Sequence, residues 1–131
     1  MSGPGASFRL RRSFVAEPQA PRAARRELAI LEGELTRDEL WRVELLVTEL
    51  LTNSIVHAGL GGRGIVTLDL AVTDDRVRAE VRDHGMGFEP ALPEEPLAGH
   101  WGMRILDRLA DYWQVDTSRG VSSVRFELRR A

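Results

Sequence analysis

The sequence predicts an α/β (α+β) fold: a two-layer sandwich in which helices cover one face of a mixed, mainly antiparallel sheet. Segments in which apolar and polar side chains alternate come in consecutive pairs joined by short turns, as β-hairpins do. Segments with helical periodicity lie between these pairs and do not alternate with single strands. A doubly wound nucleotide-binding fold needs strict strand–helix alternation and is therefore excluded. The length of 131 residues predicts a single domain over residues 1–131.

The N-terminal part predicts one strand and two helices. Alternation in SFRLRRSFV indicates the strand, and the side chains on its one side are Phe8, Leu10, Arg12 and Phe14. Prolines then introduce a helix over roughly 22–34, with an apolar stripe of Leu28, Leu31 and Leu35. Thr36 and Glu39 form a capping box that starts a longer helix, which runs to about residue 57.

The glycines of GLGGRG (59–64) end the long helix, because glycine accepts the left-handed geometry that closes helices. This segment also matches the dinucleotide-binding pattern G-x-G-x-x-G. That pattern must follow a strand and precede a helix, and here the order is reversed. We therefore reject dinucleotide binding at this segment.

The second half predicts four strands and one helix. Two strands, about 66–72 and 76–83, are joined at Asp74-Asp75, and their inward side chains are Val66, Leu68, Leu70, Val72, Val77, Ala79 and Val81. Residues 89–98 contain three prolines and three acids, which predicts a mobile loop. WGMRILDRLADYW indicates a helix with apolar contacts at Met103, Ile105, Leu106 and Leu109. Residues 112–117 and 121–129 form a final hairpin around Arg119-Gly120.

The composition excludes several classes of function. The formal net charge of −2 is unlike that of general nucleic-acid-binding proteins. All 18 positive charges are arginine, so Lys-dependent phosphate loops and Schiff-base chemistry are excluded. The chain has no Cys, and its three His lack metal-ligand spacing. No apolar run approaches the ~20 residues that span a bilayer, so we expect no membrane contact and a cytoplasmic location.

Asp83 ends a predicted strand within VRDHGMGF (81–88). It shares its side of the strand with Val81 and Ala79, so its carboxylate is expected to point toward the helix layer. Burying an unpaired carboxylate costs several kcal/mol, so Asp83 must find a donor in the protein, in water or in a ligand. The structural alternative is a strand-end Asp that caps the next turn.

The long helix carries a second polar feature at its C-terminal end. Its apolar stripe of Leu46 and Leu50 continues into Asn53 and His57, and Glu49 lies one turn before Asn53 on the same side. Such side chains are poor core residues and good ligands for a hydrated cation or a phosphate. The structural alternative is a helix end that emerges into solvent.

The third feature is AGHWGMRIL, in which Gly99 and Gly102 flank the start of a helix. The first free amides of a helix and its positive dipole end attract anions, and glycines allow a phosphate to approach the backbone closely. A linker glycine before an ordinary helix start is the structural alternative.

Together these segments resemble the histidine-kinase-like ATPase superfamily with the Bergerat ATP-binding fold, and more narrowly its stand-alone anti-sigma-factor serine kinases. ELLTNSIVHA (49–58) is similar to the N box of that family, DHGMGF (83–88) to its first glycine box and GHWGM (99–103) to its second. The likeness continues through LADYWQV and SSVRFEL, almost to the C-terminus.

The resemblance implies ATP and Mg²⁺ as cofactors and gives each feature a role. Asp83 would accept a hydrogen bond from the adenine amino group, Asn53 would hold Mg²⁺ and Glu49 would be the general base. Gly85 and Gly87 would let the backbone pass close to the base. The remaining nucleotide-binding positions are Gly99, Gly102 and Met103 at the phosphates, Ser123 near the adenine, and His57 at a phosphate or as a helix-closing residue.

Two functions remain open on the sequence alone. The resemblance implies an anti-sigma factor that transfers the γ-phosphate of ATP to a serine of an antagonist protein, with a sigma factor and that antagonist as partners. The alternative is a nucleotide-binding module that holds a sigma factor or another regulator with little or no catalysis, because His100-Trp101 enlarges the second glycine box. A sensor histidine kinase would also need a phosphoacceptor helical hairpin, for which we expect no room. Homodimerisation is a further expectation from the resemblance.

Overall fold

Five strands form a single sheet in the order β1-β2-β3-β5-β4, and all of its strand pairs are antiparallel. The computed structural model describes residues 8–57, 64–84, 101–118 and 121–130. The elements in chain order are β1 (Phe8–Val15), α1 (Ala20–Leu28), the 3₁₀ turn η1 (Ala29–Leu31), α2 (Arg37–His57), β2 (Ile65–Val72), β3 (Arg76–His84), α3 (Trp101–Leu109), β4 (Tyr112–Ser118) and β5 (Val121–Arg129).

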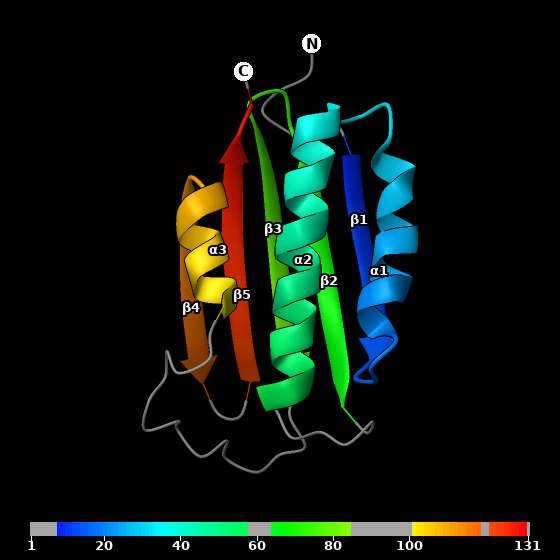
Figure 1. Ribbon diagram of the computed structural model, residues 1–131, viewed down its shortest axis with the longest axis vertical. Helices are drawn as coiled ribbons and strands as arrows, with labels where there is room; N and C mark the ends of the chain where they lie inside the picture. The colour runs from blue at the N-terminus through cyan, green and yellow to red at the C-terminus, as the bar shows by residue number, and fades with distance from the viewer. Residues whose placement is uncertain (1–7, 58–63, 85–100, 119–120, 131) are drawn as a thin grey trace.

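The three helices lie on the same face of the sheet, which confirms the predicted two-layer α/β sandwich (Figure 1). The core fills the space between the layers, and the inward residues predicted for β2 and β3 are all buried in it. Phe126 of β5 and Leu46 of α2 are among the largest fully buried side chains. Each such side chain contributes about 1.5–3 kcal/mol through burial, so this interface is the main source of stability.

The predicted sides of β1 are also confirmed, including the arginine within its apolar stripe. Arg12 pairs with Leu68 across the β1–β2 ladder and therefore lies on the helix-facing side. Its Nε donates to Oε1 of Glu27 on α1 at 2.6 Å. The pair ties α1 to the edge strand. Because both groups are partly exposed, it stabilises the fold by no more than about 1 kcal/mol.

The helix predicted over 22–34 is shorter in the structure. α1 ends at Leu28, the chain tightens into η1, and Gly33 then adopts a left-handed φ of 93°. The amides of Glu34 and Leu35 donate to the carbonyl of Leu31, at 2.9 and 3.0 Å. The apolar stripe predicted too long a helix. Leu31 and Leu35 are buried as predicted, but they lie beyond the C-terminal end of α1.

The helix predicted in WGMRILDRLADYW also ends early, at Leu109. The chain crosses to the sheet at Asp111, whose amide donates to the carbonyl of Glu127 and whose carboxylate accepts the amide of Arg129. Trp113 then lies in β4, and its indole Nε1 donates to Asp107 of α3 at 2.8 Å. Sheet pairing therefore overrides the helical periodicity after Leu109.

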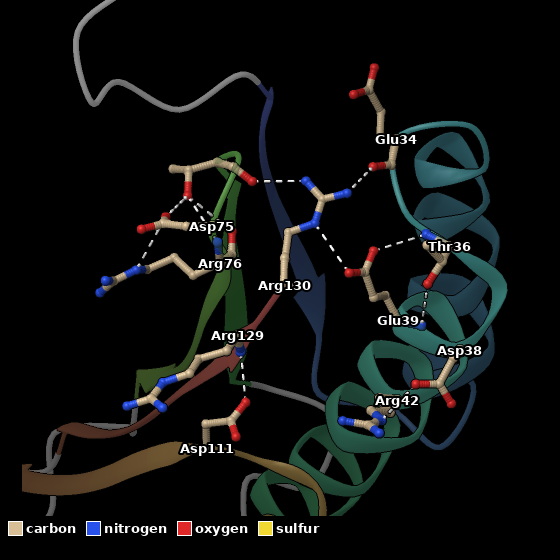
Figure 2. A network of polar contacts seen from close by, with 11 residues as sticks. Glu34, Thr36, Asp38, Glu39, Arg42, Asp75, Arg76, Asp111, Arg129 and Arg130 are labelled. Atoms are coloured by element: carbon tan, nitrogen blue, oxygen red, sulfur yellow. Dashed lines mark hydrogen bonds and ion pairs between the residues drawn. The ribbon is translucent and has the colours of Figure 1, made fainter.

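Arg130 joins the sheet to the start of α2 (Figure 2). Its guanidinium donates to the carbonyls of Thr73 and Glu34, at 2.8 and 2.9 Å, and its Nε lies 3.3 Å from Oε2 of Glu39. Burial raises the pKa of Glu39. Hydrogen bonds from the Thr36 amide and from Arg130 outweigh that effect and hold the pKa below its ordinary value.

The predicted capping box is present at the start of α2. The Glu39 amide donates to Oγ1 of Thr36 at 3.1 Å, and the Thr36 amide donates to Oε1 of Glu39 at 2.9 Å. We expect Thr36→Ala to lower the free energy of unfolding by about 1 kcal/mol, because one helix-terminal amide loses its acceptor. Urea unfolding measures the change. Thr36→Ser keeps the hydroxyl and should retain most of the stability; an equal loss in both variants would contradict a capping role.

Candidate functional site

The three sequence features that suggested a ligand site converge at one end of the molecule. The C-terminal ends of α2 and β3 and the N-terminal end of α3 lie toward the same end (Figure 1). α2 packs against both β3 and α3, which fixes the relative positions of the three segments. Asp83 lies near the C-terminal end of β3, where it pairs with Ser122 at the start of β5. Arg129, at the other end of β5, pairs with Arg76 at the start of β3.

Asp83 lies on the helix-facing side of β3, as its position in the alternation predicted. It pairs with Val66 of β2, which is fully buried, and only 7% of Asp83 is exposed. Within the described parts of the chain it is the one buried carboxylate. A charged group at such a position is costly unless it accepts hydrogen bonds, and a bound ligand can supply one of them.

Glu49 and Asn53 form the polar edge of α2 next to its buried stripe. Leu46 and Leu50 are 1% and 2% exposed, whereas Glu49 and Asn53 are half-buried, so the stripe changes from core to polar toward the helix end as predicted. Nδ2 of Asn53 is buried, and among the residues that the structure describes it has no hydrogen-bond partner. The amide is therefore available to a ligand. Its Nδ2 could donate to a phosphate oxygen, and its Oδ1 is the atom that could hold a cation.

The other predicted site residues are placed only in part. His57 is the last residue of α2, and Gly102 and Met103 lie in the first turn of α3. Gly85, Gly87 and Gly99, and the loop predicted at 89–98, lie outside the described residues, as does the His100 position of the second glycine box. Their roles stay predictions.

Ser123 is not brought together with Asp83. It pairs with Arg82 on β3 and with Asp116 on β4, so its side chain lies on the face of the sheet away from the helices. The residue that pairs with Asp83 is Ser122. The two-residue period counted back from the buried Phe126 reaches position 122 and passes over 123. Counting from that aromatic residue would have selected position 122, the strand partner of Asp83, from the sequence.

These groups form a candidate site, and its chemistry suits a ligand that carries its own negative charge and its own cation. Among the described residues, no three His, Cys, Asp or Glu side chains gather closely enough to hold a metal ion. A cation beside Asn53 would therefore take most of its oxygen ligands from phosphates and water, which is how Mg²⁺ usually binds with nucleotides. The donor set fits a Mg²⁺-nucleotide.

The fold and this candidate site are those expected of a nucleotide-binding domain. The chain belongs to the histidine kinase-like ATPase domain family, whose profile matches residues 14–128. This confirms the resemblance that the three boxes indicated.

Two relatives of this chain share the name anti-sigma F factor. The chain is 28% identical over 118 residues to an anti-sigma F factor of Clostridium acetobutylicum, and the match covers 82% of each chain. It is 35% identical over 89 residues to an anti-sigma F factor of Clostridium botulinum, which covers 64% of this chain and 62% of the relative.

A solved structure confirms the fold. The crystal structure of the RsbU and RsbW domains of Rv1364c from Mycobacterium tuberculosis matches 94% of this chain with a TM-score of 0.72 and 19% sequence identity. The matched part is 32% of that chain, so this protein spans about a third of its length. In the described part of the present chain, no helix is both long and apolar enough to cross a membrane.

Proposed function

We propose that the protein is a cytoplasmic, ATP-binding anti-sigma factor that phosphorylates a serine of an antagonist protein. The observation that carries the proposal is the buried Asp83, which lies on the helix-facing side of β3 near its C-terminal end. The polar edge of α2 lies toward the same end of the molecule. Membership of the ATPase family and the shared name of the relatives support it.

Asp83 would recognise the base. A carboxylate accepts a hydrogen bond from the amino group of adenine, whereas guanine presents a carbonyl at the corresponding position. A hydrogen bond to a charged group contributes about 1.5–3 kcal/mol, which is enough to select adenine. Gly85 and Gly87 follow directly in the chain and would let the backbone approach the ring.

Glu49 and Asn53 would serve the phosphate end. Asn53 would hold Mg²⁺ through its side-chain oxygen, and the cation, when bound, neutralises charge on the phosphates. Glu49 would accept the proton of the attacking serine hydroxyl as general base. The start of α3, with Gly102 and Met103, would present its free amides to the phosphates.

The sigma factor and the antagonist are proposed as partners from the names of the relatives, which are anti-sigma factors. Phosphorylation of the antagonist would regulate which partner the protein holds, because a phosphoserine carries close to two negative charges at neutral pH. We also propose that the protein forms a homodimer, and this part of the proposal rests on the family resemblance alone.

Glu49→Gln tests the catalytic role. We expect it to slow phosphate transfer from labelled ATP to the candidate antagonist about 10²- to 10⁴-fold, because the base is lost while its shape is kept. The ATP affinity measured by calorimetry should change less than about threefold, since a base acts on the transition state.

Glu44→Gln is the matched control, because Glu44 is a half-buried acid on α2, five positions before Glu49. It should transfer phosphate at the wild-type rate. Equal rates for wild type and Glu49→Gln would remove Glu49 from the mechanism. Wild-type protein that binds ATP and captures a sigma factor but transfers no phosphate would establish the binding-module alternative.

A further inference from the structure

The face of the sheet that no described helix covers contains a cavity. It has a volume of about 500 Å³ and lies over β3, β5 and β4. Its lining residues are Arg76, Arg78, Asp111, Tyr112, Gln114, Arg125, Glu127 and Arg129. We name it the arginine cavity. Asp83 and α2 lie on the other side of the sheet, so this cavity is separate from the candidate nucleotide site.

The arginine cavity has an excess of positive charge. Glu127 forms ion pairs with two arginines of the cavity. Its carboxylate oxygens lie 3.1 Å from Nη1 of Arg76 and 3.6 Å from Nε of Arg78. The Asp111 carboxylate accepts the backbone amide of Arg129 at 2.6 Å, as Figure 2 shows. Asp75 does not line the cavity, but its Oδ1 lies 3.5 Å from Nε of Arg76.

Among the described residues, the guanidinium groups of the remaining two arginines have no acidic partner. Arg125 Nη2 donates to the neutral side-chain oxygen of Gln114 at 3.0 Å. Within the described chain, no carboxylate forms an ion pair with the guanidinium of Arg125 or Arg129. The local excess contrasts with the net charge of −2 of the whole chain.

We propose that the arginine cavity docks an acidic segment of a partner protein. Guanidinium groups bind carboxylates through paired, charge-assisted hydrogen bonds, and Arg and Tyr are among the residues enriched at the binding hot spots of protein interfaces. Tyr112 is 51% exposed beside these arginines, and its hydroxyl donates to Gln114 at 2.9 Å. β4 is an edge strand, so an extended segment can reach the cavity from the side.

Other occupants fit less well. A small-molecule site would be lined mainly by apolar side chains, and this lining is charged. A nucleic acid needs a basic stripe on a basic domain, and here the net charge is −2 and two acids line the cavity. A second copy packed symmetrically on this face would place the same arginines against each other.

The test uses a fluorescein-labelled peptide of alternating Glu and Thr as the probe, with a matched peptide of alternating Gln and Thr, and fluorescence anisotropy of the full chain at low salt. We expect the acidic peptide alone to bind, and its affinity to fall with added salt. The double variant Arg78→Glu/Arg125→Glu should bind it at least about tenfold more weakly. The double variant Arg78→Gln/Arg125→Gln should also bind the acidic peptide more weakly than the wild type. This variant tests the site if the charge-reversed variant does not fold.

Arg9→Glu is the matched control, because Arg9 is exposed on the same face of the sheet but on the far edge strand β1. It should bind the acidic peptide within about twofold of wild type, since it lies outside the cavity. Absence of binding by wild type, or equal weakening by Arg9→Glu, would overturn the proposal. Tighter binding of a DNA duplex than of the peptide, lost in the double variant, would also overturn it in favour of nucleic acid. ATP titrations of the same samples report the nucleotide site separately, so failure of one proposal does not imply failure of the other.

Discussion

Asp83→Asn is expected to weaken ATP binding by about 10- to 150-fold, the equivalent of a lost hydrogen bond to a charged group. The carboxylate is 7% exposed and lies where β3 meets the helix layer, so little water is available to replace it. An amide of the same shape presents one donor and one acceptor in place of two acceptors. Calorimetric titration with ATP and Mg²⁺ measures the change.

Asp69→Asn is the control for this experiment. Asp69 lies on β2, next to β3, but on the opposite face of the sheet, where it pairs with Arg11 at 3.6 Å. It should bind ATP like the wild type. A folded Asp83→Asn protein with unchanged ATP affinity would remove adenine from Asp83. Folded wild type that does not bind ATP would end the nucleotide proposal altogether.

Arg130→Ala is expected to lower the free energy of unfolding by about 3 kcal/mol. The side chain joins three separate segments, because it donates to the carbonyls of Thr73 and Glu34 and pairs with Glu39. Its side chain is 18% exposed, so removal leaves partly buried acceptors without a donor. Urea unfolding followed by circular dichroism measures the loss.

Arg129→Ala should change stability by less than about 0.5 kcal/mol, because that side chain is exposed and its contact with Asp111 is made by the backbone. A loss below about 1 kcal/mol for Arg130→Ala would contradict the role of this contact.

The contact between Arg130 and Glu39 also predicts that the stability depends on pH. The pKa of Glu39 is lower in the folded protein than the ordinary value of 4.5, so the unfolded chain binds the proton more readily. The stabilisation is therefore complete above that value and is lost as the pH falls from it through the folded pKa. Arg130→Ala should show a smaller loss over this window, since one of the groups that lowers the pKa is gone.

Much of the fold could be predicted because local signals and tertiary packing agree. The alternation in β2 and β3 marks the residues that are buried, and the capping box of Thr36 and Glu39 marks the start of α2. The predicted helix boundaries are wrong where the local signals and the tertiary packing disagree. The stripe of Leu28, Leu31 and Leu35 continues past the end of α1, because a 3₁₀ turn and a left-handed glycine also deliver side chains to the core.

The candidate site divides in the same way. Position in a strand or helix predicted the burial of Asp83 and the polar edge at Glu49 and Asn53. Ser123 was chosen by family likeness, and the strand register separates it from Asp83. The arginine cavity could not be predicted, because it depends on which strands are neighbours in the sheet. Arg78 and Arg125 are distant in sequence and meet only because β3 pairs with β5.

The placement of β1 at the edge of the sheet has a consequence for how the chain folds. β2 with β3, and β4 with β5, are each consecutive in the chain, whereas the nearest β1–β2 pair, Val15 with Ile65, closes a loop of about 50 residues. We expect the two hairpins and their docking to precede the addition of β1. Any state that lacks β1 presents β2 as an unpaired edge to other chains, so we expect such a state to be prone to aggregation.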